Sequence, residues 1–123
     1  MNTSPHRVLL AEDDQELRKL FTDILEADGC RVEAVADGRI ALERIAASPD
    51  AFDLVITDWT MPGASGAEVI RAAKEYGLKA ILVSAGSKER IEAVGFAAGA
   101  DAVLRKPDDV GQIIPTMRRI LGG

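Results

Sequence analysis

Five short apolar runs recur along the chain, and a segment of amphipathic spacing follows each of them. The runs that we expect to form strands are residues 8–11, 32–35, 54–56, 80–83 and 102–104. Between them, apolar residues recur every three or four positions, as at Leu17, Leu20 and Ile24, which is typical of one face of a helix. The pattern therefore predicts five strand–helix units in succession.

Turn and capping residues bound the predicted helices. Asp28 and Gly29 end the first helix, because glycine readily adopts the left-handed conformation found at helix C-termini. Ser48 before Pro49 ends the second. The fourth helix is expected over residues 88–98.

Pro115 interrupts the last predicted helix, whose apolar spacing continues through residues 110–121. A proline inside a helix removes one hydrogen bond and clashes with the preceding turn. Two interpretations follow. The helix kinks at 111–115, which we favour, or it begins late, with Pro115 in its first turn.

The alternation of strands and helices predicts an α/β fold in which helices cover both faces of a five-stranded parallel sheet. Right-handed crossovers leave few arrangements, and the doubly wound, flavodoxin-like strand order 2-1-3-4-5 fits best. Residues 54–56 are apolar throughout, as in a strand buried on both faces, whereas residues 32–35 mix polar and apolar positions, as an edge strand does. The length of 123 residues suits a single domain, 1–123.

Composition and charge exclude several classes of function. The net charge of −5 argues against contact with nucleic acid or with an anionic membrane surface, because both require basic surfaces. One cysteine and one histidine are too few for a Cys/His zinc site. No apolar run approaches the roughly 20 residues of a spanning helix, and the N-terminus lacks the apolar segment of a signal peptide. We therefore expect a cytoplasmic protein.

Reactive side chains gather where the predicted strands end. They are Glu12, Asp13 and Asp14 after the first run, Asp58 after the third, Ser84 after the fourth and Lys106 after the fifth. Because the carboxyl ends of parallel strands open on one edge of the sheet, we expect these groups in one cleft. Clustered carboxylates repel one another, and a divalent cation relieves that repulsion. Oxygen ligands alone suit Mg²⁺, or Mn²⁺ in its place.

A cation beside an ammonium group attracts a phosphoryl group. The metal and Lys106 would neutralise phosphoryl oxygens, and Ser84 would donate a hydrogen bond. Asp58 is then placed as a nucleophile that forms an acyl phosphate. Taken singly, such residues are more often turn, cap or surface residues. Their convergence favours a phosphoryl site.

The sequence resembles the receiver domains of two-component response regulators over nearly its whole length. The matching segments are residues 8–14, 58–63, Gly66, 84–85, 99–101 and 106–107, and Trp59 is similar to the tryptophan of chemotaxis-type receivers. The resemblance implies a phosphorylation-dependent signalling switch and not a turnover enzyme. Its phosphoryl donor would be a histidine kinase or a histidine phosphotransfer protein, and phosphorylation would change its affinity for a protein partner.

The resemblance also implies metal ligands. Asp13 and Asp58 match direct ligands, Glu12 matches an acid that acts through water, and Thr60 matches a residue whose backbone carbonyl binds the metal. Asp14 is near enough to be a ligand, but the family register favours Glu12 and Asp13. We therefore favour a role for Asp14 in capping the first helix.

The remaining implied roles concern the phosphoryl group. Asp58 matches the phosphorylated aspartate, and Ser84 and Lys106 match the residues that contact the phosphoryl group. The peptide bond between Lys106 and Pro107 is expected to be cis.

The fourth helix, fifth strand and fifth helix form the face that receivers generally use for partner contacts. Gly63 and Gly66 are interpreted as flexible loop positions beside the site.

Besides Pro115, two positions depart from the family pattern. Val103 stands where receivers commonly carry a tyrosine or phenylalanine that swings inward on activation, so we expect the loop after Ser84 to move instead. Asp108 replaces a more apolar residue and, with Asp109, is expected to cap the last helix.

Two other function classes fit less well. A metal-dependent phosphatase or phosphotransferase of the aspartyl-phosphate type needs a second Asp two residues after the nucleophile, where this chain has Thr60, and an insertion that forms a cap. A receiver-like scaffold that is never phosphorylated does not need Asp13, Asp58, Ser84 and Lys106 together. Because no effector segment follows the last helix, we expect a stand-alone receiver, and a piece of a larger protein is the alternative.

Overall fold

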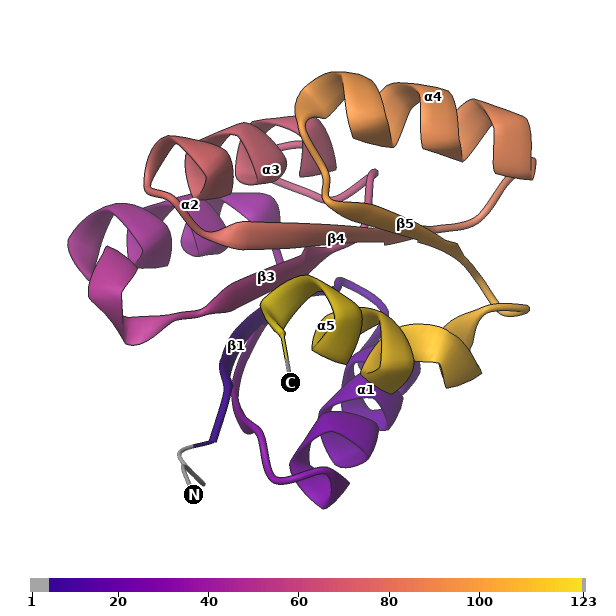
Figure 1. Ribbon diagram of the computed structural model, residues 1–123. Helices are drawn as coiled ribbons and strands as arrows, with labels where there is room; N and C mark the ends of the chain where they lie inside the picture. The colour runs from indigo at the N-terminus through magenta and orange to yellow at the C-terminus, as the bar shows by residue number, and fades with distance from the viewer. Residues whose placement is uncertain (1–4, 123) are drawn as a thin grey trace.

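A parallel five-stranded sheet forms the middle layer of the protein, which a computed structural model describes over residues 5–122 (Figure 1). The strand order is β2-β1-β3-β4-β5, as predicted. The strands are β1 (Arg7–Ala11), β2 (Arg31–Val35), β3 (Leu54–Thr57), β4 (Lys79–Ser84) and β5 (Ala102–Arg105). The predicted flavodoxin-like fold is therefore confirmed.

Helices cover both faces of the sheet (Figure 1). One face carries α1 (Gln15–Ala27) and α5 (Ile113–Leu121), and the other carries α2 (Gly38–Ala47), α3 (Gly66–Glu75) and α4 (Lys88–Ala98). Short 3₁₀ turns at Pro49–Ala51 and Val110–Gln112 precede β3 and α5. The predicted bounds of α4 are confirmed.

Neighbouring residues of a strand point to opposite faces, so each buried strand contributes to two apolar clusters. Leu9 and Leu82 pack with residues of α2, α3 and α4, whereas Leu10 and Ile81 pack with residues of α1 and α5. Every residue of β3 is at most 1% exposed, which confirms a strand buried on both faces. Only β1 borders β2, whose residues are half-buried or exposed, so the predicted edge strand is also confirmed.

Side-chain caps begin four of the helices. The Asp14 carboxylate accepts a hydrogen bond from the Leu17 backbone N–H at 3.0 Å, which confirms the predicted cap of α1. Gly29 follows this helix with a φ of 92°, as the left-handed turn requires. Gly66 is not a flexible loop position, contrary to our interpretation, because it is the buried first residue of α3.

The favoured kink of the last helix is wrong. The helix begins at Ile113, after the 3₁₀ turn, and Pro115 lies in its first turn. The N–H groups of a first turn have no partner within the helix, so a proline there removes no helical hydrogen bond. The late start that we weighed as the alternative is the one observed.

The predicted cap of this helix by Asp108 and Asp109 is also wrong. The Asp108 carboxylate pairs with the Arg105 guanidinium at 2.5 Å, and the Asp109 carboxylate accepts the Arg105 backbone N–H at 3.0 Å. Both acids therefore bind back to the end of β5. Gln112 precedes α5 and makes no side-chain cap.

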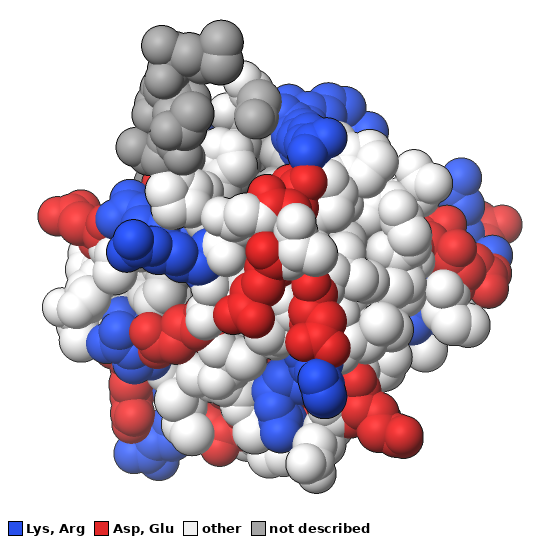
Figure 2. Space-filling view, turned by 90° about the horizontal axis from the view of Figure 1, so that it is seen from below, with Lys and Arg blue, Asp and Glu red and all other residues white. Residues whose placement is uncertain are grey.

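Charges are mixed on the face that carries α1 and α5. Figure 2 shows this face from below, with basic side chains interspersed among acidic ones. Across residues 5–122, no helix combines the length and the apolar character needed to cross a bilayer.

The Asp53 carboxylate ties the start of β3 to the start of β1. It accepts the Arg7 backbone N–H at 2.8 Å and a guanidinium N–H at 3.1 Å. Burial opposes the negative charge, but the contacts with Arg7 outweigh burial and lower the pKa of Asp53. A carboxyl group with a lowered pKa stabilises the fold above its unfolded-state pKa of about 3.9, and the stabilisation disappears as pH falls through the folded-state pKa.

We therefore expect Asp53→Asn to lower the free energy of unfolding at pH 7 by about 1 kcal/mol or less, because the pair is partly exposed. Urea unfolding between pH 7 and pH 2.5 measures the difference, which shrinks toward the acid end. Asp50→Asn is the control, because Asp50 contacts Arg7 through its backbone carbonyl. A difference that is constant across the pH range contradicts the role of the Asp53 charge.

Candidate functional site

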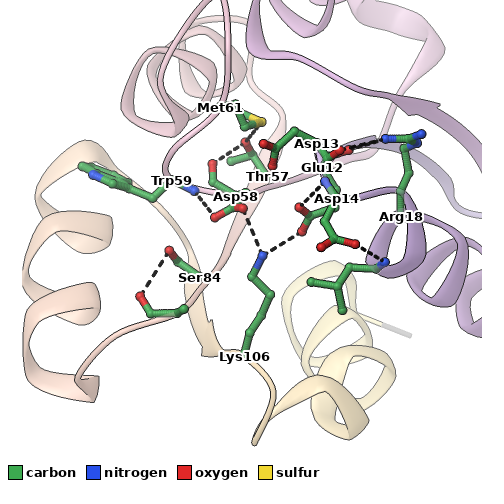
Figure 3. Close-up of polar contacts among 12 residues, drawn as sticks. Glu12, Asp13, Asp14, Arg18, Thr57, Asp58, Trp59, Met61, Ser84 and Lys106 are labelled. Atoms are coloured by element: carbon green, nitrogen blue, oxygen red, sulfur yellow. Dashed lines mark hydrogen bonds and ion pairs between the residues drawn. The ribbon is translucent and has the colours of Figure 1, made fainter.

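The reactive residues meet at the carboxyl edge of the sheet, as the strand order requires. Glu12 follows β1, Asp58 follows β3, Ser84 ends β4 and Lys106 follows β5. Figure 3 shows the side chains of Glu12, Asp58 and Lys106 pointing toward one another. The structure thus brings together side chains that are up to 94 positions apart in the chain.

Lys106 lies between two carboxylates. Its Nζ is 2.9 Å from Oε1 of Glu12 and 3.0 Å from Oδ2 of Asp58. The side chain of Glu12 is only 2% exposed, and those of Lys106 and Asp58 are 11% and 12% exposed. Charges so poorly solvated persist only when they are paired, and Lys106 supplies the pairing.

Burial and pairing act in opposite directions on the site. Burial raises the pKa of Glu12 above its ordinary value, and the hydrogen bond from Lys106 offsets only part of this effect. Burial also disfavours the charged form of Lys106, but the bonds to Glu12 and Asp58 outweigh burial, so the pKa of Lys106 is raised. Lys106 is therefore a cation at neutral pH.

Three carboxylates share this edge with one ammonium group. Oxygen atoms of Glu12, Asp13 and Asp58 all lie within 4.8 Å of one another. Lys106 contacts two of these groups, and the Asp13 side chain lies on the exposed side of the cluster. Oxygen donors with unbalanced negative charge fit a hard divalent cation such as Mg²⁺.

Asp14 does not join this cluster. Its carboxylate caps α1 through Leu17, and its backbone N–H donates to Oε2 of Glu12 at 3.1 Å (Figure 3). Asp14 therefore helps to orient Glu12.

The Asp58 carboxylate is oriented by two donors. Its Oδ1 accepts the Trp59 backbone N–H at 2.6 Å, and its Oδ2 faces Lys106. The Asp58 backbone N–H donates to the carbonyl oxygen of Ala11 at 3.0 Å, which continues the pairing between β1 and β3. Asp58 thus extends the backbone pairing of the sheet.

A cavity of about 310 Å³ opens between the two residues that follow Asp58 and the segment that begins at Ser84. Trp59 and Thr60 line one side, and Ser84, Gly86 and Arg90 line the other. The Ser84 hydroxyl lies 3.5 Å from the carbonyl oxygen of Ala85, a long contact that leaves it available to a stronger acceptor. The bond between Lys106 and Pro107 is cis, as expected.

Sequence reasoning missed Arg18. Its guanidinium donates to the backbone carbonyl oxygen of Glu12 at 2.9 Å and lies 3.4 Å from that of Asp13. These contacts hold the acidic segment from the α1 side. The sequence signal was the spacing between Asp14 and Arg18. Arg18 comes four residues after the N-cap Asp14, so one helical turn places its side chain next to the segment that precedes the helix.

Thr57 was missed as well. It is fully buried at the end of β3, and its hydroxyl donates to the carbonyl oxygen of Asp58 at 2.8 Å. A hydroxyl group directly before Asp58, at the end of an apolar run, was the only sequence signal.

A family model of the response regulator receiver domain matches residues 8–118. The chain is 31% identical over 117 residues to the transcriptional regulatory protein CpxR of Escherichia coli strain K12. It is 36% identical over 113 residues to the KDP operon transcriptional regulatory protein KdpE of the same strain. These matches cover 94% and 90% of this chain but 49% of each relative, so the chain spans about half the length of the curated relatives it matches.

Solved structures agree with these matches. The CheY-like receiver domain protein of Methanospirillum hungatei JF-1 has a TM-score of 0.81 and 28% identity, with coverage of 97% of this chain and 95% of its own. Receiver domains generally bind Mg²⁺ at an acidic pocket and act as signalling switches in response regulators, which take phosphoryl groups from histidine kinases. With its strand order, its acidic edge and the match over residues 8–118, this chain belongs to the response regulator receiver domain family of two-component signalling.

Proposed function

We propose that this protein is a phosphorylation-dependent switch in which Asp58 accepts a phosphoryl group. The donor is the phosphohistidine of a histidine kinase or of a histidine phosphotransfer protein. An Asp58 carboxylate oxygen forms the new P–O bond while the P–N bond to the donor imidazole breaks, and the released imidazole takes up a proton. The placement of Asp58 next to both Lys106 and the acids that follow β1 carries the proposal.

The proposed metal ligands are Asp13 and Asp58 directly, Glu12 through water, and the backbone carbonyl of Thr60. The proximity of the three carboxylates and their excess over Lys106 support this assignment. Mg²⁺, or Mn²⁺ in its place, supplies positive charge to the phosphoryl oxygens when it is bound. Glu12 is the most buried of the three acids and is held by Lys106 and Asp14, which suits an indirect role.

Lys106 and Ser84 are the proposed contacts of the phosphoryl group. The Lys106 ammonium already faces Oδ2 of Asp58, so it lies within reach of the oxygen atoms of a phosphoryl group attached to this carboxylate. Ser84 lines the cavity next to Trp59 and Thr60. Its hydroxyl makes only a long contact of 3.5 Å, with the carbonyl oxygen of Ala85, so donation to a phosphoryl oxygen would break no strong hydrogen bond. Both donors favour the extra negative charge of the phosphorylated state.

Phosphorylation adds charge and strong acceptors at this edge, and the switch transmits that change to a protein partner. We propose that the partner binds the face formed by α4, β5 and α5. A groove of about 260 Å³ on that face is lined by charged residues from all three elements, among them Lys88, Arg105 and Arg119. In this proposal residues 1–123 act as one receiver domain that assists its own phosphorylation, is not a turnover enzyme, and contacts neither nucleic acid nor membrane.

Incubation with acetyl phosphate and Mg²⁺, followed by intact mass measurement, tests the acceptor. Wild type is expected to gain one phosphoryl group, and Asp58→Asn is expected to gain none, because an amide oxygen is a far weaker nucleophile. Omission of the metal abolishes the gain. Asp14→Asn is the matched control, since asparagine also caps helices and Asp14 lies outside the acidic cluster. An undiminished gain in Asp58→Asn places the acceptor elsewhere.

Binding of Mg²⁺ alone is measurable through Trp59, the only tryptophan, whose backbone N–H donates to the Asp58 carboxylate. We expect Mg²⁺ to change its fluorescence and Asp13→Asn to weaken binding by about tenfold or more, because one charged ligand is lost. Asp14→Asn should shift the dissociation constant by about twofold at most. Equal weakening by both variants would indicate a general charge effect and contradict the ligand assignment.

The switching movement is expected in residues 84–90. Val103 lies directly under α4, where its Cγ2 is 2.7 Å from the position that a Cβ at Gly95 would take, and it has no ring to rotate. Residues 85–90 are exposed, and Gly86 has a φ of 125°. A structure with a phosphoryl analogue on Asp58 should show residues 84–90 displaced while Val103 keeps its rotamer. An unchanged 84–90 segment rules out this movement.

A further inference from the structure

The backbone carbonyl of Asp58 lies against Gly66, the first residue of α3. A Cβ atom at Gly66 would be 2.1 Å from the Asp58 carbonyl oxygen, 2.7 Å from Cα of Trp59 and 3.0 Å from the Asp58 carbonyl carbon. All three are backbone atoms, so no rotation of a side chain relieves the overlap. The Gly66 N–H also donates to the carbonyl oxygen of Trp59 at 2.7 Å, which closes the contact.

Thr57 holds the same carbonyl through a hydrogen bond. Its hydroxyl donates to the Asp58 oxygen at 2.8 Å, and its side chain is fully buried. Met61 packs beside it, with Sδ 3.9 Å from the hydroxyl oxygen. The Asp58 carbonyl is therefore fixed by a hydrogen bond from Thr57 and by close contact with Gly66.

This constraint reaches the carboxylate through one peptide unit. The Asp58 carbonyl and the Trp59 N–H belong to the same planar group, so the direction of one determines the direction of the other. The Trp59 N–H donates to Oδ1 of Asp58 at 2.6 Å, while Oδ2 faces Lys106. A rotation of this peptide plane would turn the N–H and release the carboxylate from its orientation.

We propose that Gly66 and Thr57 are positioning residues for phosphorylation: they fix the peptide plane between Asp58 and Trp59, and through its N–H they fix the direction of the Asp58 carboxylate. This inference rests on the proposed function. Neither residue touches the phosphoryl donor. Their effect is on the geometry of attack, to which displacement reactions are sensitive at the scale of 1 Å or less.

The chain offers a matched control at Gly38. It is the first residue of α2, and a Cβ there would be 2.1 Å from the carbonyl oxygen of Ala64. Its N–H donates to the carbonyl oxygen of Pro62 at 3.0 Å. Gly38 and Gly66 therefore contact the two ends of one loop in the same way, but only Gly66 contacts the acceptor.

The test compares rates of phosphoryl gain from acetyl phosphate at saturating Mg²⁺, by intact mass, in variants that circular dichroism shows to be folded. Gly66→Ala and Thr57→Val are expected to slow the reaction by about tenfold or more, and Gly38→Ala by about twofold at most. Thr57→Ser, which keeps the hydroxyl, should restore a rate near that of wild type. A general loss of loop stability does not produce this pattern, because Gly38→Ala disturbs the same loop.

Equal rates for wild type, Gly66→Ala and Thr57→Val overturn the inference, and so does equal slowing by Gly38→Ala and Gly66→Ala. If Gly66→Ala does not fold, the comparison of Thr57→Val with Thr57→Ser decides, and equal rates for those two contradict the inference. Absence of any phosphoryl gain in wild type contradicts the proposed function itself. The two failures are thereby distinguished.

Discussion

The contact of Lys106 with two buried carboxylates is the interaction on which the site depends. Its partners follow β1 and β3, and Lys106 itself follows β5, so the contact forms only when three strands that are distant in sequence lie in one sheet. Burial destabilises each of these charges when it is unpaired. The cluster keeps a net negative charge, because Asp13 adds a third carboxylate to a site with a single ammonium group. This acidic edge fits a divalent cation, and the proposed phosphoryl site rests on it.

The backbone at Asp58 has more contacts with its surroundings than the exposed segment 85–90 beside it. Asp58 is hydrogen-bonded to Ala11 of β1 and to the Thr57 hydroxyl, and its carbonyl packs closely against Gly66 of α3. Residues 85–90, on the other side of the cavity, are exposed throughout. This contrast suits the proposed switch, because a phosphoryl group on Asp58 could change the conformation of the exposed segment without displacing Asp58 itself.

Sequence reasoning performed well where a residue's role follows from its position along an element. The edge strand, the buried strand and the cap by Asp14 follow from periodicity and from N-terminal residue preferences, which are local properties. It failed at the start of α5, where the apolar spacing of a 3₁₀ turn and the following helix reads as one continuous helix. It also failed at Asp108 and Asp109, because a cap and a contact with Arg105 look alike in sequence.

The sequence by itself determined the strand order and the edge at which Glu12, Asp13, Asp58, Ser84 and Lys106 meet, because alternating periodicities and short crossovers leave few parallel arrangements. Only the tertiary structure decided which carboxylates Lys106 contacts, that Arg18 supports the acidic segment, and that Gly66 packs against the Asp58 backbone. The reason is physical: hydrophobic patterning records which face of an element is buried, whereas the direction of a side chain at a strand end depends on atoms supplied by distant segments.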